Sequence, residues 1–344
     1  MESIDGRQIG QYIIAHEIGR GSMGAVYRAH HLDTPHQPVA IKILLAALAT
    51  DNSFITRFTR ETEALRAMRH PHVIRIMDAG QDSGMLYYVM EFINGTTVGA
   101  MLKLRQRIPV VEAVEIGAQV ADALDYVHHT GHLIHRDIKP DNIMVDRWVT
   151  AKVLDFGLAR IDGAYTITRA GMVVGSLYYV PSEHLRGEKI DGRADTYALG
   201  VSMYEMMTGE RPFRGKTLQE MSKAIAAGNP VPPSLLEPTI PIELEAIVLK
   251  ALARKREDRY SRASEMHDAL RQLQHSGKLL NPYEEEPPTQ HLATMGSSAQ
   301  NPTPYAAPMP HLDRNTPRLP RFVRATGDLH QGGLPGIPNA PEKR

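Results

Sequence analysis

The chain has 344 residues, and its 39 Lys and Arg balance 39 Asp and Glu, so it carries no formal net charge. We therefore expect neither nucleic acid nor a membrane as a charge-driven partner. The absence of Cys excludes disulfides, thiolate metal sites and a cysteine nucleophile. The first residues lack the pattern of a signal peptide, and no apolar run approaches the roughly 20 residues that cross a bilayer, which predicts a soluble, cytoplasmic chain.

Proline divides the chain into two parts. Residues 281–344 hold 12 of the 24 Pro, few large apolar residues and no helical or strand periodicity. Such a segment cannot bury enough surface to offset its ordering entropy. We predict a folded domain over about 10–275 and a Pro-rich disordered tail over 276–344.

Within the domain, strand patterns precede helical ones. Strands are predicted at Tyr12–Ile18, Ala25–Ala29, Pro38–Leu44 and Met85–Phe92, with one helix at 51–69 whose Phe54, Phe58, Leu65 and Met68 share a face. Further helices are predicted at 111–129, 194–208, 217–227 and 241–253. The pattern indicates an α+β chain with a small strand-rich lobe, about 10–93, and a larger helical lobe, about 94–275, with the functional site between them.

A glycine-rich turn lies between the first two strands. Gly19, Gly21 and Gly24 fit G-x-G-x-x-G, in which backbone amides can approach phosphate because no Cβ intervenes. In a dinucleotide-binding fold the third glycine opens a helix, whereas Ala25–Ala29 continues as a strand. This argues for a hairpin that covers phosphates and against a hydride-transfer site.

The strand Val39-Ala40-Ile41-Lys42 ends in a lysine that could reach phosphates if a carboxylate held its side chain. The helix at 51–69 offers Glu61 and Glu63. Residues two apart on a helix lie on roughly opposite faces, so only one can point at Lys42. We choose Glu61, partly because its spacing to His70-Pro71 matches the family described next.

Two further motifs decide the interpretation: His135-Arg136-Asp137-Ile138-Lys139-Pro140-Asp141-Asn142 and Asp155-Phe156-Gly157. With the glycine-rich turn and the Lys42 strand they make four motifs in a fixed order and spacing. Over about 10–275 the chain resembles the eukaryotic-like protein kinases, most closely their bacterial Ser/Thr branch. The resemblance implies a bilobal protein kinase fold, with a small antiparallel-sheet N-lobe carrying one helix and a larger helical C-lobe.

The resemblance also implies roles. Asp137 would accept or orient the proton of the substrate hydroxyl, and Lys139 would contact the γ-phosphate and mark the Ser/Thr branch, with Lys42 and Glu61 completing the catalytic set. Asn142 and Asp155 would hold Mg²⁺, with Mn²⁺ as an alternative, against the phosphates of ATP. Phosphoryl transfer needs positioned cations and little covalent help, which is why these residue types suffice.

The same resemblance places the nucleotide. Met90 would be the gatekeeper, and the main chain of Glu91 and Ile93 would hydrogen-bond adenine. The remaining residues expected around the purine and the phosphates are Ile18, Gly19, Gly21, Gly24, Val26, Ala40, Lys42 and Met144.

The resemblance also implies regulation, because Arg136 lies beside Asp137, an arrangement that in this family usually needs an anion to order the activation segment. Spacing favours Thr168, then Thr166, as the phosphorylated residue. The family's Pro-Glu pair departs here to Pro181-Ser182-Glu183. Glu183 can still pair with Arg259, whereas the local backbone and peptide docking are left open.

Two other groups of residues have an expected structural place. Asp195, with Gly200, matches the buried helix that anchors the catalytic loop. His128, His129 and His132 fall at a helix end, where imidazoles suit the helix dipole, and we do not interpret them as metal ligands.

The function predicted is ATP-dependent phosphoryl transfer to Ser/Thr hydroxyls of protein substrates in signal transduction, with activation-loop autophosphorylation. The alternative is a non-catalytic pseudokinase or scaffold that acts through its tail. Two readings of the tail stay open, a target for a phosphothreonine-binding partner and an inert linker. A homodimer that activates in trans is a further candidate, because kinases of this branch often use one.

Overall fold

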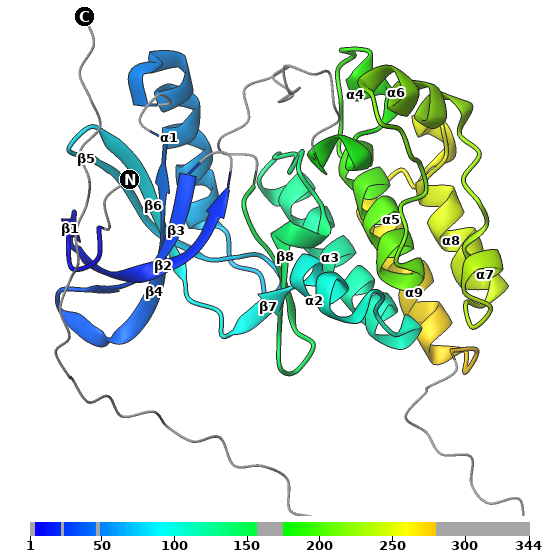
Figure 1. Cartoon of the computed structure of the whole chain (residues 1–344), viewed down its shortest axis with the longest axis horizontal. Coiled ribbons are helices and arrows are strands. Elements are labelled where there is room, and N and C mark those ends of the chain that lie inside the picture. Colours follow the sequence, from blue (N-terminus) through cyan, green and yellow to red (C-terminus); the bar gives the residue numbers. More distant parts are fainter. Residues whose placement is uncertain (1–3, 22–23, 46–48, 157–174, 280–344) are drawn as a thin grey trace, which may run out of the picture. The chain divides into compact units, whose positions relative to one another are not determined.

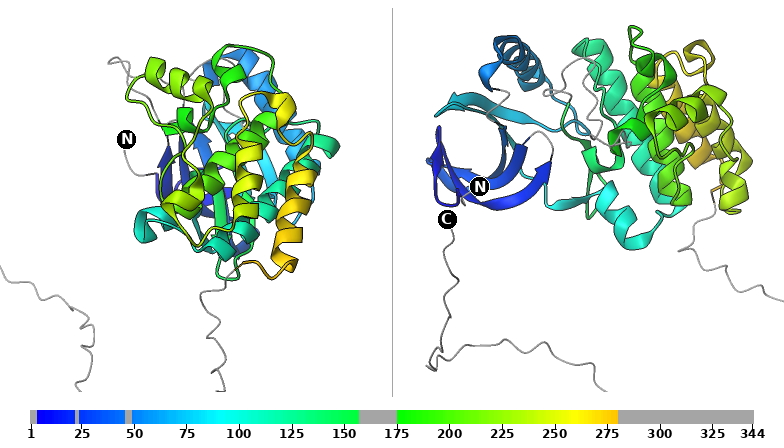
Figure 2. Two further views of the ribbon diagram at one scale, coloured as in Figure 1. Left: turned by 90° about the vertical axis from the view of Figure 1, so that its right-hand side faces the viewer. Right: turned by 45° about the horizontal axis from the view of Figure 1, so that its top comes forward.

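Alternating apolar and polar residues in the first part of the chain form a six-stranded antiparallel sheet in the computed structural model, which describes residues 4–21, 24–45, 49–156 and 175–279 (Figure 1). The strands follow the order β1-β2-β3-β4-β6-β5, and Figure 2 shows them curling strongly. Their bounds are β1 Gln8–Ile9, β2 Tyr12–Gly21, β3 Gly24–His31, β4 Thr34–Leu44, β5 Ile76–Asp82 and β6 Met85–Glu91.

One helix, α1 (Asn52–Ala67), accompanies this sheet. Asp51 caps its N-terminus by accepting hydrogen bonds from the amides of Ser53 and Phe54. The predicted apolar face is confirmed, because Phe54, Phe58 and Leu65 are buried. This face packs toward β5 and β6, so the helix and the sheet share one core.

Most of the remaining described chain is helical, which confirms the predicted change of pattern (Figure 1). A small sheet of β7 (Gly95–Thr97), β8 (Ile143–Asp146) and β9 (Ala151–Val153) was not anticipated. The helices are α2 Val98–Arg105, α3 Val110–Thr130, α4 Ser182–Leu185, α5 Arg193–Thr208, α6 Leu218–Ala227, α7 Pro233–Leu236, α8 Ile242–Ala251 and α9 Ala263–His275. Three 3-10 turns are η2 Pro140–Asn142, η3 Gly175–Tyr179 and η4 Arg256–Asp258.

Helix α3 is the centre of the larger lobe. Ile116, Val120 and Leu124 have no exposed surface, and the helix packs against both α5 and α9. At Gly117 an added Cβ would lie 2.6 Å from the sulfur of Met203 on α5, so the end of the Met203 side chain packs closely against α3 at this glycine. Burial on nearly all sides makes α3 and α5 a rigid base for the loops that they carry.

The described residues belong to the first of two units of the chain, Met1–Glu286. The predicted tail beyond residue 279, which includes the second unit, Pro287–Arg344, lies outside the described residues. Among the described helices, none combines the length and the apolar character that a membrane span requires.

Candidate active site

The glycine-rich segment forms the expected hairpin. β2 pairs with β3 in antiparallel register, with Gly21 opposite Gly24, and no helix follows. A Cβ added to Gly24 would lie 2.0 Å from the carbonyl oxygen of Ile43, so this glycine lets β3 approach β4. A Cβ at Gly19 or Gly21 would meet no atom within 4 Å. Packing therefore does not demand glycine at these two positions, and the expected approach of a phosphate to the backbone stays a prediction.

Lys42 projects from β4 and forms an ion pair with Asp155, with Nζ 2.7 Å from Oδ2. The ion-pair partner of Lys42 differs from the expected Glu61: among the described residues, Lys42 forms its ion pair with Asp155. Glu61 lies half-buried on α1. Both side chains of the pair are mostly shielded from solvent, which reduces screening and favours the contact. The two groups expected at the phosphates and the metal therefore lie together.

The other oxygen of the same carboxylate has a partner that the sequence analysis missed. The hydroxyl of Tyr88, on β6, donates a hydrogen bond of 2.6 Å to Asp155 Oδ1. Burial raises the pKa of Asp155, while Lys42 and Tyr88 lower this pKa by more than burial raises it. The pKa of Asp155 therefore lies below its usual value, and the carboxylate stays ionised. Burial and then the charge of Asp155 raise the pKa of Tyr88 well above its usual value, so the hydroxyl keeps its proton.

The catalytic-loop residues converge on Asp137. Lys139 Nζ lies 2.7 Å from Asp137 Oδ2, and the amide nitrogen of Asn142 donates to the same oxygen at 3.0 Å and to the Asp137 carbonyl at 2.8 Å. The backbone of Leu154 donates to the carbonyl of Asn142 at 2.8 Å. This bond ties the loop to the segment that carries Asp155, and so joins the candidate base to the candidate metal ligands.

The base of this loop is anchored by a buried carboxylate on α5. Asp195 Oδ2 accepts from the amide of His135 at 2.7 Å, and Oδ1 accepts from the amide of Arg136 at 2.8 Å. His128 Nε2 lies 2.8 Å from Asp195 Oδ2. Burial raises the pKa of Asp195, and the contacts with His128 and the loop outweigh this and lower it. The expected anchoring helix is confirmed, and His128 is part of the anchor, a role that spacing alone did not indicate.

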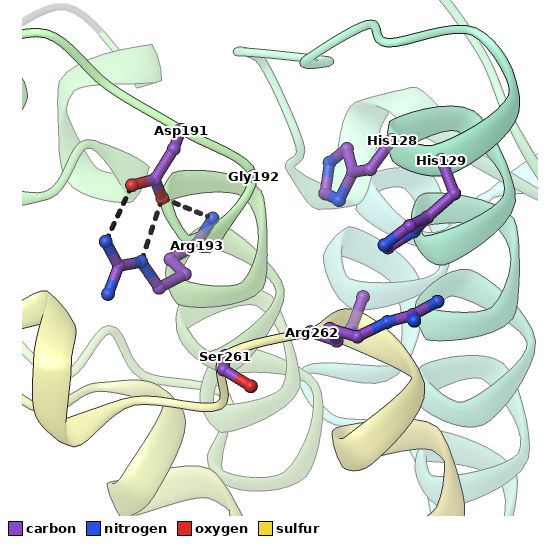
Figure 3. A pocket seen from close by; sticks show the side chains of 8 residues that line it. His128, His129, Asp191, Gly192, Arg193, Ser261 and Arg262 are labelled. Carbon is purple, nitrogen blue, oxygen red and sulfur yellow. Dashed lines mark hydrogen bonds and ion pairs between the residues drawn. The ribbon is translucent and has the colours of Figure 1, made fainter.

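His128 and His129 also project from α3 into a cavity of about 350 Å³ at the starts of α5 and α9 (Figure 3). Arg193 lies against Asp191 there, with two nitrogens 3.0 and 2.8 Å from the carboxylate oxygens. Arg262, across the cavity, pairs with Asp125 at 2.9 Å. The two arginines that line this cavity, Arg193 and Arg262, are thus each paired with a carboxylate. We therefore interpret the cavity as part of the structural scaffold and not as part of the active site.

The predicted hinge lies at the end of β6. The backbone amide of Glu91 donates a hydrogen bond to the carbonyl of Arg75, and the Glu91 carboxylate accepts one from Lys152 Nζ at 2.8 Å. These two contacts hold Glu91 in place. Met90 and Ala40 face each other across β4 and β6 and are both buried. The other expected adenine-site residues lie in β2, β3, β8 and the segment after β6, namely Ile18, Val26, Met144 and Ile93.

The segment with the shifted proline leads into the larger lobe. Pro181 directly precedes α4 and makes no side-chain capping hydrogen bond, and Glu183 on this helix is buried. Next to it, the Tyr179 hydroxyl donates to Glu205 on α5. A second cavity, of about 790 Å³, opens beside this segment and is lined by Tyr178, Glu205, Gly209, Glu210, Arg211, Arg214, Gly215, Lys216 and Glu220. The two expected phosphorylation sites, Thr168 and Thr166, lie outside the described residues.

Comparison with known proteins places this arrangement in a family. The protein kinase domain family matches residues 12–273. The serine/threonine-protein kinase PknB of Mycobacterium leprae is 38% identical over 273 residues, covering 78% of this chain and 43% of that protein. PknB of Mycobacterium tuberculosis strain H37Rv is 34% identical over 324 residues, covering 92% of this chain and 51% of that protein.

A solved structure gives the same result for the fold. The kinase domain of Mycobacterium tuberculosis PknI matches with a TM-score of 0.63 at 30% identity, over 78% of this chain and 98% of that one. The chain belongs to the protein kinase family, and both the resemblance to its bacterial Ser/Thr branch and the predicted bilobal fold are confirmed. The chain spans about half the length of the curated relatives that it matches.

Proposed function

We propose that this chain transfers the γ-phosphoryl group of ATP to Ser and Thr hydroxyls of protein substrates in signal transduction. The observation that carries the proposal is the Asp137 carboxylate, held by Lys139 and Asn142 and linked through the backbone to Asp155 and its ion pair with Lys42. A base, two cations and two oxygen ligands are the parts that phosphoryl transfer requires.

Protein kinases use ATP and a divalent cation, and the side chains here fit Mg²⁺ in particular. Asp155 supplies carboxylate oxygens, and Asn142, whose amide nitrogen is bound to Asp137, has its amide oxygen for a cation. Among the described residues, no group of three or more His, Asp or Glu could hold a metal alone. Mg²⁺ is bound typically by one or two protein ligands together with phosphates, a requirement that this sparse set meets, and Mn²⁺ is the alternative. When bound, the ion neutralises charge on the phosphates.

The chain's own residues then divide the work. Asp137 accepts the proton of the substrate hydroxyl, and Lys139, 2.7 Å from that carboxylate, moves to the γ-phosphate. Lys42 turns from Asp155 to the α- and β-phosphates. The hairpin of β2 and β3 covers the phosphates with Gly19, Gly21 and Gly24, while the main chain of Glu91 and Ile93 binds adenine between Val26, Ala40 and Met144.

Regulation and partners follow the same proposal. Phosphorylation of Thr168 or Thr166 orders the activation segment through Arg136. The tail is either a target of phosphothreonine-binding partners or a linker, and a homodimer would let one copy phosphorylate another. Because the reaction consumes ATP, we place the domain in the cytoplasm. No observation among the described residues favours the scaffold alternative.

The test is transfer of labelled phosphate from ATP to a generic Ser/Thr-containing protein, followed by phosphoamino acid analysis. We expect phosphoserine or phosphothreonine with the wild-type chain and none with Asp137→Asn, which removes the base but keeps the shape. Equal labelling by both proteins, or label in small molecules alone, would overturn the proposed function.

A further inference from the structure

Tyr88 occupies a position that packing alone could fill with an apolar side chain. It is 2% exposed, and its ring lies 6.3 Å from that of Phe58 on α1. A hydroxyl buried this deeply is costly unless it is hydrogen-bonded. Its described partner is Asp155 Oδ1, at 2.6 Å. The hydroxyl, the one polar group of this side chain, therefore donates its hydrogen bond to the carboxylate that the proposed function assigns to the metal.

The sheet register explains how this contact arises. Tyr88 on β6 lies directly opposite Lys42 on β4, and opposite residues of an antiparallel pair share one face. The Lys42 ammonium lies 5.9 Å from the Tyr88 ring centre. Both side chains consequently reach the same carboxylate from one face, Tyr88 to Oδ1 and Lys42 to Oδ2.

Nucleotide binding affects the two contacts to Asp155 differently. Under the proposed function, on which this inference rests, Lys42 turns to the phosphates and Oδ2 loses its partner. The Tyr88 hydroxyl has no such competing task, because it lies in the core under α1. It keeps Oδ1 in place, so that the carboxylate cannot rotate freely and Oδ2 is the oxygen presented to the cation.

We propose that Tyr88 is a positioning residue for the metal site, acting through Asp155 by holding one carboxylate oxygen so that the other meets the divalent cation. Partners that orient metal ligands commonly change metal affinity by about 10- to 100-fold when removed. Tyr88→Phe deletes only the hydroxyl and keeps the ring. We therefore expect Tyr88→Phe to change how nucleotide binding depends on the Mg²⁺ concentration.

The experiment measures ADP binding to the full chain by calorimetry, first in EDTA and then across a Mg²⁺ titration. For Tyr88→Phe we expect metal-free affinity within about twofold of wild type, and a Mg²⁺ concentration for half-maximal tightening that is raised about tenfold or more. Tyr88→Leu, which lacks the same hydroxyl, should show the same shift. Metal-free ADP affinity reports in each variant that the nucleotide site is folded.

The matched control is Tyr87→Phe. Tyr87 is the adjacent residue of β6, is 7% exposed and lies near Gly80 and Gly10, on the other face of the strand from Asp155. It should leave the Mg²⁺ dependence at the wild-type value. Equal Mg²⁺ dependence in Tyr88→Phe and wild type, or equal loss of metal-free and Mg²⁺-dependent affinity, would overturn the positioning role alone. A wild-type chain that binds no nucleotide with Mg²⁺ would overturn the proposed function and this inference with it.

Discussion

Arg259 and Glu183 form a bidentate ion pair in the core, with Nη1 2.6 Å from Oε1 and Nη2 3.0 Å from Oε2. Their side chains are 0% and 5% exposed. The guanidinium also donates to the carbonyl of Ala253 and lies 4.7 Å from the ring centre of Tyr197. The shifted proline at 181 has therefore not disturbed the pair, which confirms that Glu183 still binds Arg259.

Arg259→Ala should strongly destabilise the domain. It leaves the Glu183 carboxylate buried without its partner, and breaking a buried pair from one side costs about 3 to 5 kcal/mol. Urea unfolding monitored by circular dichroism measures the loss. The control is Arg256→Ala, whose ion pairs are more exposed and worth under about 1 kcal/mol. Similar midpoints for the two variants would contradict this account.

Ser182→Pro should be tolerated and slightly stabilising. Ser182 is the first residue of α4, where proline is favoured, and Pro181 before it is already extended at ψ 160°. The Ser182 hydroxyl is buried without a hydrogen-bond partner among the described residues, so its loss costs nothing. We expect a gain of about 0.4–1 kcal/mol in unfolding free energy. A lower thermal midpoint than wild type would show that the serine has a role that these contacts do not reveal.

Asp195→Asn should loosen the catalytic loop. The carboxylate accepts from the His135 and Arg136 amides, and an amide group in its place offers one acceptor oxygen for two donors. A buried donor left unsatisfied costs about 1–3 kcal/mol. Denaturant unfolding should report that loss, together with a lower kcat and nearly unchanged ADP affinity. Asp191→Asn, four residues earlier and with a side chain that is 44% exposed, is the control and should stay within about 1 kcal/mol of wild type.

Glu115 gives a pH dependence with a defined sign. Burial raises its pKa, and hydrogen bonds from Arg271, Gln119 and Gln274 lower it more, to about 2 against an ordinary 4.5. The folded value lies below the unfolded one, so its contribution is complete above pH 4.5 and is lost as pH falls toward 2. Because the group is 31% exposed, we expect Glu115→Gln to cost only about 1 kcal/mol at pH 7.

That cost should be smaller at pH 3 than at pH 7, as measured by urea unfolding of both proteins at each pH. Glu63→Gln on α1, where the side chain is exposed, is the control and should show little difference at either pH. A Glu115→Gln cost that grows as the pH falls would contradict the assigned direction.

The features that the sequence predicted correctly are those determined by residues close together in the chain. Strand alternation, the buried face of α1 and the motif around Asp137 are encoded within a few residues each, and the structure has them as expected. What it did not predict depends on contacts distant in sequence. Tyr88 meets Asp155 across 67 residues, and His128 meets Asp195 across another 67, so neither contact has a local signal.

The partner of Lys42 is instructive for the same reason. Helical spacing could rank Glu61 against Glu63, but it could not weigh either of them against a carboxylate elsewhere in the fold. Lys42 and Tyr88 face one way because of the register between β4 and β6, and this register brings both to Asp155. Predicting that choice requires the packed sheet rather than the helix alone.

The central claim is tested most directly by the intact mass of the full chain after incubation with ATP and Mg²⁺, beside Asp137→Asn treated identically. We predict added phosphates on the wild-type chain only, mapping to Thr168 or Thr166 and then to the tail. Equal phosphate incorporation in both proteins, or none in the wild type despite ADP binding with Mg²⁺, would contradict the assignment of an active, autophosphorylating Ser/Thr kinase with Asp137 as its base.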